Sequence, residues 1–183
     1  MRKIVSGLFI TLDGVVEAPA KWNPPFYNEE MTEAVWTQLN RADAMLLGRH
    51  SYRLFSTVFA GKTAADIPVA DWMNKTPKFV VSNTLGTADW ENTTVIGGDL
   101  AVSELEKLKE QPGRDIHVGA SPTLVRWLLR QGLLDELNLI LHPVVVGTGM
   151  RLFDDSAGRV PLKLEESTTF STGVVNLWYA VSR

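Results

Sequence analysis

The chain has 183 residues, 45% of them hydrophobic, a length that suits one compact domain with a substantial core. Its formal net charge of -3 leaves no surplus of lysine and arginine for a nucleic-acid backbone, which argues against a DNA or RNA partner. The absence of cysteine excludes disulfides, thiolate nucleophiles and cysteine-based metal sites, and it suits a reducing, cytoplasmic compartment.

The chain begins with a strand-like run. Residues 3–12 are mostly apolar and end at Asp13 and Gly14, a pair typical of turns. The basic start and the small residues at 18–20 resemble a secretory signal peptide, yet Pro19 occupies the cleavage site and polar residues interrupt the apolar run. A first strand is therefore the better interpretation. No apolar run reaches the roughly 20 residues that a membrane-spanning helix needs, so we expect no membrane partner.

Strand and helix signals alternate along the rest of the chain. The patterns predict further strands at 44–48, 78–82, 93–97, 115–119 and 137–146, and helices at 28–41, 50–59, 100–110 and 122–131. Two extended runs joined by Ser171, Thr172 and Gly173 predict an antiparallel hairpin, over residues 162–170 and 174–182. We expect an α/β fold in one domain over 1–183: a mostly parallel sheet flanked by helices and completed by an antiparallel hairpin.

Several predicted strands run into glycine- or hydroxyl-rich junctions. These hold Gly48, Arg49 and Ser51, then Ser82, Asn83 and Thr84, then Gly97 and Gly98 before a helix that Asp99 can cap, and finally residues 119–124. Arg49 is informative because the helix dipole disfavours a guanidinium at a helix N-terminus unless an anion binds there too. The carboxyl ends of parallel strands meet at one edge of the sheet, so the four junctions together favour a nucleotide-like ligand.

The junction at 119–124 has two interpretations. Ser121 can cap the following helix, Pro122 can occupy its first turn and Gly132 can end it, which requires no ligand. Alternatively, Gly119 permits a close approach of the backbone, and free N–H groups at such a helix start bind anions such as phosphate.

Other motifs are missing from the chain. Gly147, Thr148 and Gly149 lack the third glycine of a dinucleotide-binding fingerprint, and neither a phosphate-binding loop nor a G-x-S-x-G elbow is present. The histidines at 50, 117 and 142 are separated from one another, so we expect no metal site.

Acidic and aromatic residues near the N-terminus allow two interpretations each. Asp13 is either a turn residue or a functional carboxylate, and Glu30 begins a predicted helix, where negative charge suits the dipole. Trp22 and Phe26 lie in the long segment 13–27 and either form a wall for a flat substrate or close the core beneath the loop.

The motifs, in this order, resemble those of the dihydrofolate reductase-like superfamily, particularly the C-terminal reductase domain of bacterial riboflavin-biosynthesis deaminase-reductases and its stand-alone relatives. The similarity is carried by TLDG at 11–14, LLGRHSY at 46–52, VVSNTL at 80–85, VGASPTLVRWLL at 118–129 and DELNLILHPVVVGTGMRLF at 135–153. The resemblance covers nearly the whole chain. It implies a sheet of about eight strands with a final antiparallel pair.

The resemblance also implies an NADPH site across the strand ends. Arg49 and Ser51 would hold phosphates, Ser82 and Asn83 the adenosine side, and the backbone from Gly119 to Leu124 the pyrophosphate, a stretch that includes Ala120, Ser121 and Thr123. Gly48 and Gly97 complete the predicted cofactor edge. Asp13 would lie in or beside the substrate pocket as the catalytic residue, and Glu30 or its neighbour Glu29 would correspond to the proton-donating carboxylate of folate reductases.

We therefore predict a cytoplasmic, homodimeric, NADPH-dependent reductase of a small heterocyclic compound, such as a pterin or aminopyrimidine, or of a carbonyl compound. The alternative is a non-catalytic dimeric nucleotide- or ligand-binding protein on the same fold. Two departures from the family are visible. Ala120 replaces a glycine common at this position, and residues 15–30 lack the pattern that binds the substrate phosphate, so the substrate does not carry over.

Overall fold

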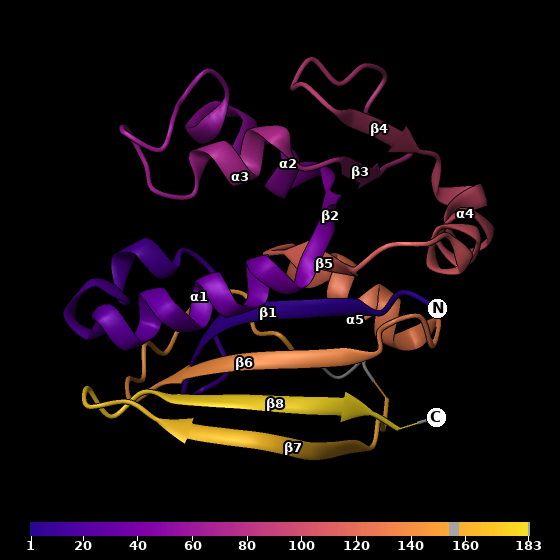
Figure 1. The fold of residues 1–183 in the computed structure, drawn as a ribbon. Coiled ribbons are helices and arrows are strands. Elements are labelled where there is room, and N and C mark those ends of the chain that lie inside the picture. Colours follow the sequence, from indigo (N-terminus) through magenta and orange to yellow (C-terminus); the bar gives the residue numbers. More distant parts are fainter. Residues whose placement is uncertain (154–157, 183) are drawn as a thin grey trace.

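The computed structural model describes residues 1–153 and 158–182. Its centre is an eight-stranded sheet in the order β4-β3-β2-β5-β1-β6-β8-β7 (Figure 1). The strands are β1 Ile4–Thr11, β2 Ala42–Gly48, β3 Lys78–Val81, β4 Thr93–Ile96, β5 Asp115–Gly119, β6 Glu136–His142, β7 Leu162–Thr169 and β8 Val175–Val181. Neighbours from β4 to β6 are parallel, whereas β8 is antiparallel to both β6 and β7. The predicted α/β class and the C-terminal hairpin are confirmed.

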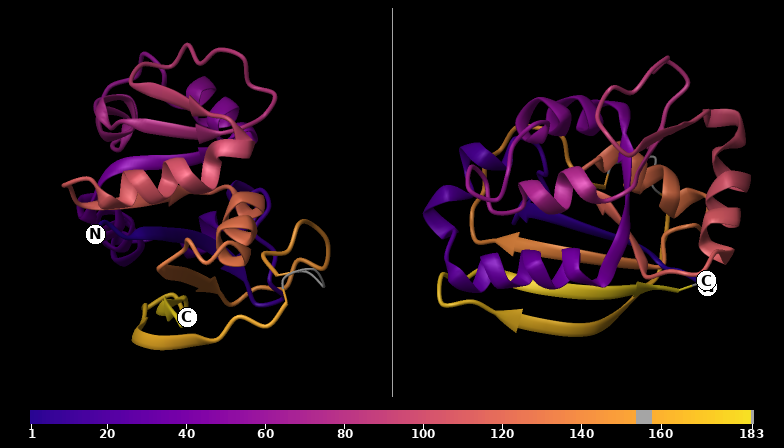
Figure 2. Two further views of the ribbon diagram at one scale, coloured as in Figure 1. Left: turned by 90° about the vertical axis from the view of Figure 1, so that its right-hand side faces the viewer. Right: turned by 45° about the horizontal axis from the view of Figure 1, so that its top comes forward.

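Helices cover both faces of the sheet (Figure 2). They are α1 Glu29–Arg41, α2 Arg49–Phe59, α3 Ala70–Lys75, α4 Ala101–Glu110 and α5 Pro122–Arg130, with short 3-10 turns η1 Pro19–Lys21, η2 Pro24–Phe26 and η3 Gly98–Leu100. Alternate residues of β2 pack against the helices on opposite faces of the sheet, because successive side chains of a strand point to opposite faces. Leu46 packs with residues of α4 and α5, whereas Met45 and Leu47 pack with residues of α2 and α3.

The structure corrects three local predictions. The strand expected over 137–146 ends at His142, before Pro143, which has no N–H to donate to a sheet. Residues 60–77, where no helix or strand is predicted, contain α3, and the segment 13–27 contains η1 and η2. Asp99 lies within η3 and does not cap α4, whose N-cap residue is Leu100.

A buried lysine joins α3 to β3. Lys78 is fully buried, and its ammonium donates hydrogen bonds of 2.9 Å to the carbonyl oxygens of Met73, Asn74 and Thr76. The ammonium also lies 4.4 Å from the centre of the Trp90 ring, close enough for a cation–π interaction. These contacts satisfy carbonyl groups at the C-terminal end of a helix of only six residues, and they fix the start of the strand that leads to Ser82.

No helix in the described part of the chain is long and apolar enough to span a membrane.

Candidate cofactor and substrate site

The four junctions come together along one edge of the sheet, as predicted from the parallel strand order. A cleft of about 670 Å³, here called the polar cleft, is lined by residues from the ends of β2 and β3, from η3 and from the start of α5. Eight of the predicted cofactor residues line it, namely Gly48, Arg49, Ser51, Ser82, Asn83, Ser121, Thr123 and Leu124. Gly97 does not line the cleft, but its neighbour Gly98 does.

Two helices begin at this cleft without a side-chain cap. The N-cap residues are Gly48 for α2 and Ser121 for α5, and neither helix has an acidic residue in its first turn. Ser121 occupies the N-cap position of α5, as one interpretation expected, but its side chain makes no capping hydrogen bond. Its hydroxyl instead accepts a 3.0 Å hydrogen bond from the N–H of Gly48 and donates one of 3.0 Å to the carbonyl of Gly119. Both helix N-termini therefore direct partial positive charge to the cleft.

The turn before α5 has an unusual backbone. Ala120 and Ser121 have positive φ angles of 49° and 58°, in the left-handed region that disfavours residues with a Cβ atom. Gly119 is explained by packing, because a Cβ atom there would come within 3.1 Å of Cε2 of Phe55. We call residues 119–122 the hinge turn. Two successive left-handed residues store local strain, which is typical of functional sites.

Hydrogen bonds organise the other junctions of the polar cleft. Arg49 donates to the hydroxyl of Thr84, and Asn83 accepts from the N–H of Gly98. The hydroxyl of Ser82 accepts from the N–H groups of Thr84 and Leu85 at 3.1 and 3.0 Å. The end of β3 is thus tied to α2 on one side and to η3 on the other, which holds a guanidinium at the cleft.

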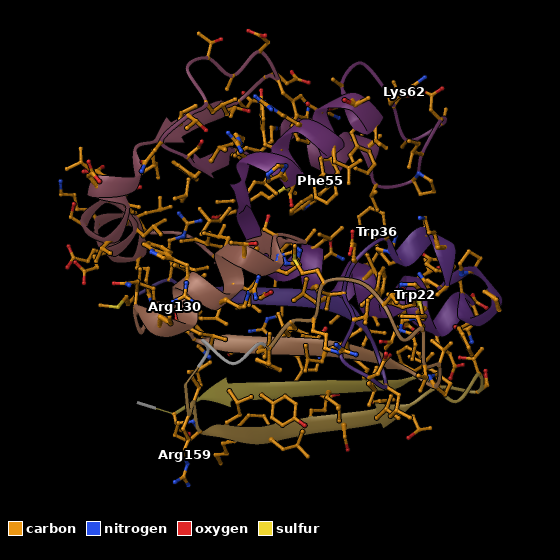
Figure 3. All side chains as sticks on the ribbon, turned by 180° about the vertical axis from the view of Figure 1, so that it is seen from behind. Trp22, Trp36, Phe55, Lys62, Arg130 and Arg159 are labelled. Atoms are coloured by element: carbon orange, nitrogen blue, oxygen red, sulfur yellow. The ribbon has the colours of Figure 1, made fainter. Side chains whose placement is uncertain are left out.

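An apolar pocket of about 350 Å³ lies on the other side of the hinge turn. Gly119, Ala120 and Pro122 line it, and Pro122 lines the polar cleft as well. Most of its wall comes from hydrophobic side chains of β1, α1, α2 and α3, and Phe55 extends from α2 toward β5 (Figure 3). The polar cleft and the apolar pocket therefore adjoin at the hinge turn, where Pro122 lines both.

Gln38 is one of two polar side chains in the lining of the apolar pocket. It crosses over Gly7 of β1, where a Cβ atom would come within 1.7 Å of its Oε1 atom. Its Nε2 atom donates to Oδ1 of Asn138, and Nδ2 of Asn138 donates to Oδ1 of Asn176 at 2.6 Å and to the carbonyl of Leu177 at 3.0 Å. A buried chain of three amides thus crosses the sheet from the pocket to β8.

His117 of β5 is the other polar side chain in this lining. The residue is 7% exposed, and its ring contacts Trp72 edge to face at 6.3 Å. Burial lowers the pKa of His117 to about 4, so the ring is neutral at physiological pH. Within residues 1–153 and 158–182, neither nitrogen of the ring has a hydrogen-bond partner.

Asp13 lies at a loop rather than in the lining of the apolar pocket. Its carboxylate accepts hydrogen bonds from the hydroxyl of Thr11 at 2.6 Å and from the N–H groups of Gly147 at 2.9 Å and Val146 at 3.3 Å. The Thr11 hydroxyl above all, together with these N–H groups, holds the pKa of Asp13 below its usual value. The contacts give Asp13 a structural role in the turn, and its catalytic role stays a prediction.

None of the predicted substrate residues is in the lining of the apolar pocket. Trp22 and Phe26 pack against the ring of His142 at 5.0 and 5.7 Å, so they close the core beneath the loop, and Figure 3 shows Trp22 well away from Phe55. Glu30 accepts hydrogen bonds from Ser171 in the β7–β8 turn and faces a separate cleft beside α1. Hydrogen bonds from Ser171 lower the pKa of Glu30. Contact of these three residues with a substrate stays a prediction.

Gln38 and His117 are not among the site residues predicted from the sequence. Gln38 lies on the helical face that also carries Met31 and Val35, and a polar residue on such a face is a detectable signal. His117 interrupts an otherwise apolar strand in the same way. Among the described residues no group of histidine and acidic side chains could hold a metal ion.

Comparisons with known proteins identify the family and the fold. A family model described as the RibD C-terminal domain matches residues 2–176. The uncharacterized protein YyaP of Bacillus subtilis is 33% identical over 183 residues, which cover 97% of this chain and 94% of YyaP. A Shewanella sp. PV-4 structure named for riboflavin biosynthesis has a TM-score of 0.73 at 18% identity, with all of both chains covered. Dihydrofolate reductase from Enterococcus faecalis, complexed with NADP(H), has a TM-score of 0.66 at 10% identity over 99% of this chain and 97% of the reductase.

Proposed function

The chain belongs to the RibD C-terminal domain family, and from that premise we propose that it is an NADPH-dependent reductase of a small heterocyclic or carbonyl compound. The polar cleft would hold the phosphates and the adenosine, the hinge turn the pyrophosphate, and the apolar pocket the nicotinamide ring beside the substrate. The reductases of this family use NADPH, and the fold is that of an enzyme solved with NADP(H).

One observation carries the proposal. The N-termini of α2 and α5 open without side-chain caps into a single cleft, and that cleft contains Arg49. Free N–H groups, two helix dipoles and a guanidinium form a strong anion site, which suits a dinucleotide with several phosphates. The residues present therefore fit the cofactor.

The chain's own residues would orient and enclose the reacting groups. When bound, NADPH supplies the two electrons and the hydrogen that a reduction needs. The hinge turn sets the direction in which the nicotinamide ring enters, and the apolar lining around Phe55 excludes water from the reacting carbon.

Binding is tested by titration with NADPH and NADH, followed by tryptophan fluorescence and by thermal shift. Trp127 lines the polar cleft, so its fluorescence reports directly on an occupant. Arg49→Ala should weaken NADPH binding at least tenfold, because it removes a charge-assisted phosphate contact. The matched control is Arg53→Ala, one turn further along α2, exposed and outside the cleft lining. Failure of millimolar NADPH to bind the wild-type protein would refute the proposal.

Turnover is a separate test. NADPH consumption with pterin or aminopyrimidine substrates should be abolished in Asp13→Asn if that carboxylate is catalytic, and an unchanged rate would remove Asp13 from the mechanism.

The alternative function, a dimeric ligand-binding protein without catalysis, is favoured by one observation: no aspartate or glutamate is among the described residues that line the apolar pocket. NADPH binding without consumption of any tested substrate would favour it. Sedimentation of the full chain tests the proposed homodimer.

A further inference from the structure

The charge distribution differs sharply between the two halves of the site. The polar cleft contains Arg49, Arg130 and Asp99, whereas no charged side chain is among the described residues that line the apolar pocket. Moving a phosphate or carboxylate into such surroundings without a partner is strongly unfavourable. The pocket volume of about 350 Å³ is near the lower end of the range for ligand sites, about 300 to 1000 Å³. An occupant that shares it with a nicotinamide ring must be small and uncharged.

The orientation of Gln38 follows from the chain of amides. The carbonyl oxygen of Leu177 only accepts hydrogen bonds, so Asn138 must direct its NH₂ group there and its oxygen toward Gln38. Gln38 therefore directs its own NH₂ group to Asn138. Its oxygen is left over Gly7, and within the described residues that oxygen accepts no hydrogen bond. The pocket thus contains one carbonyl acceptor whose orientation is fixed.

His117 supplies the complementary donor. A neutral imidazole carries one N–H and one acceptor nitrogen. His117 and Gly119 share a face of β5 about 7 Å apart along the strand, and Gly119 pairs with Gly7, beneath Gln38. Gln38 and His117 therefore lie over the same face of the neighbouring strands β1 and β5, and both line the apolar pocket. Both side chains are more than nine-tenths buried, and each keeps hydrogen-bonding capacity that the described residues leave unused.

We propose that the substrate is an uncharged, unphosphorylated nitrogen heterocycle with a cyclic amide or amidine edge, whose N–H donates to Gln38 and whose C=O or C=N group accepts from His117. This inference rests on the proposed function, because it takes the nicotinamide ring to be the neighbour in the pocket. The uncharged lining and the two unpaired polar groups specify the class.

Reduction of such a ring adds a hydride from NADPH to the carbon of the double bond and a proton from water to its nitrogen or oxygen, and leaves NADP⁺. The N–H of neutral His117 stabilises the negative charge that develops on that nitrogen or oxygen atom. His117 keeps its own proton, because the alternative is an imidazolate in an apolar pocket.

Two probes separate charge from shape. 6-Methylpterin and 6-carboxypterin share a ring system with a cyclic amide and C=N bonds, and they differ in one substituent, a methyl group against a carboxylate. Binding of each to the NADPH-free protein is measured by calorimetry, with His117→Phe, Gln38→Leu and the control Gln111→Leu, which changes an exposed glutamine after α4. NADPH binding to each variant, measured in parallel, shows that the variant is folded.

We expect 6-methylpterin to bind wild-type protein at least tenfold tighter than 6-carboxypterin. His117→Phe and Gln38→Leu should each weaken 6-methylpterin binding at least tenfold with NADPH binding unchanged, and Gln111→Leu should change neither. If Gln38→Leu does not fold, the binding of 6-methylpterin to His117→Phe tests the inference. Equal affinity for the two pterins, no binding of either at millimolar concentration, or full affinity in His117→Phe would overturn the inference. Failure of the wild-type protein to bind NADPH would instead refute the proposed function.

Discussion

The buried histidine of the apolar pocket makes the stability of the protein depend on pH in a calculable way. His117 has a pKa of about 4 in the folded protein, against an ordinary value of 6.5, because burial disfavours the charged ring. Above pH 6.5 the ring is neutral in both the folded and the unfolded chain and contributes nothing to the pH dependence. Between pH 6.5 and 4 only the unfolded chain binds the proton, so stability falls as the pH falls. A shift of about 2.5 units corresponds to about 3 kcal/mol.

The perturbation is His117→Phe, compared with wild type by urea unfolding across this pH range. Both proteins share the carboxylates and His142, whose pKa burial also lowers, so these groups cancel in the difference. The difference in unfolding free energy should be flat above pH 6.5 and should move by about 3 kcal/mol in favour of the variant by pH 4. Profiles that stay parallel down to pH 4 would refute the assignment of a buried, neutral His117.

Two further predictions concern the supports of the site. Lys78→Met should lower the unfolding free energy by about 3 kcal/mol, because three buried carbonyl oxygens lose their donor. The control Lys75→Met, at an exposed position, should lower it by less than about 0.5 kcal/mol. Both are measured by urea unfolding. Ala120→Gly should raise the unfolding free energy by about 1 kcal/mol, because glycine adopts a positive φ without strain. The control Ala60→Gly, at a φ of -57°, should lower the unfolding free energy. Changes of the same sign at both positions would argue against strain in the hinge turn.

The secondary structure was largely predictable because its signals are local. Runs such as MLLG at 45–48 and FVVS at 79–82 are mostly apolar and bounded by turn residues, and the structure has strands over 42–48 and 78–81. The gathering of the junctions in the polar cleft was also predictable once the strands were taken to be parallel, because the carboxyl ends of parallel strands lie at a common edge of the sheet. The helix α3 was not predictable in this way, because its six residues are stabilised by the side chain of Lys78, which lies outside the helix at the start of β3.

The chemistry of the candidate site was less predictable because it depends on contacts between distant residues. The turn role of Asp13 depends on N–H groups more than 130 positions away, at Val146 and Gly147. The places of Trp22 and Phe26 depend on how the N-terminal loop folds back onto His142. The acceptor that Gln38 presents to the pocket depends on the orientation of a carbonyl group in β8. A linear pattern contains none of these three relations.

The chain of amides from Gln38 to Asn176 gives the pocket an unusual route to change during evolution. Asn138 is not among the described residues that line the apolar pocket, yet its oxygen sets the direction of the Gln38 amide. A substitution of Asn138 that placed a donor toward Gln38 would turn Gln38 around, and the pocket would then offer an N–H where it had offered an oxygen. Related chains could therefore diverge in the ring they accept while every residue that lines the pocket stays the same.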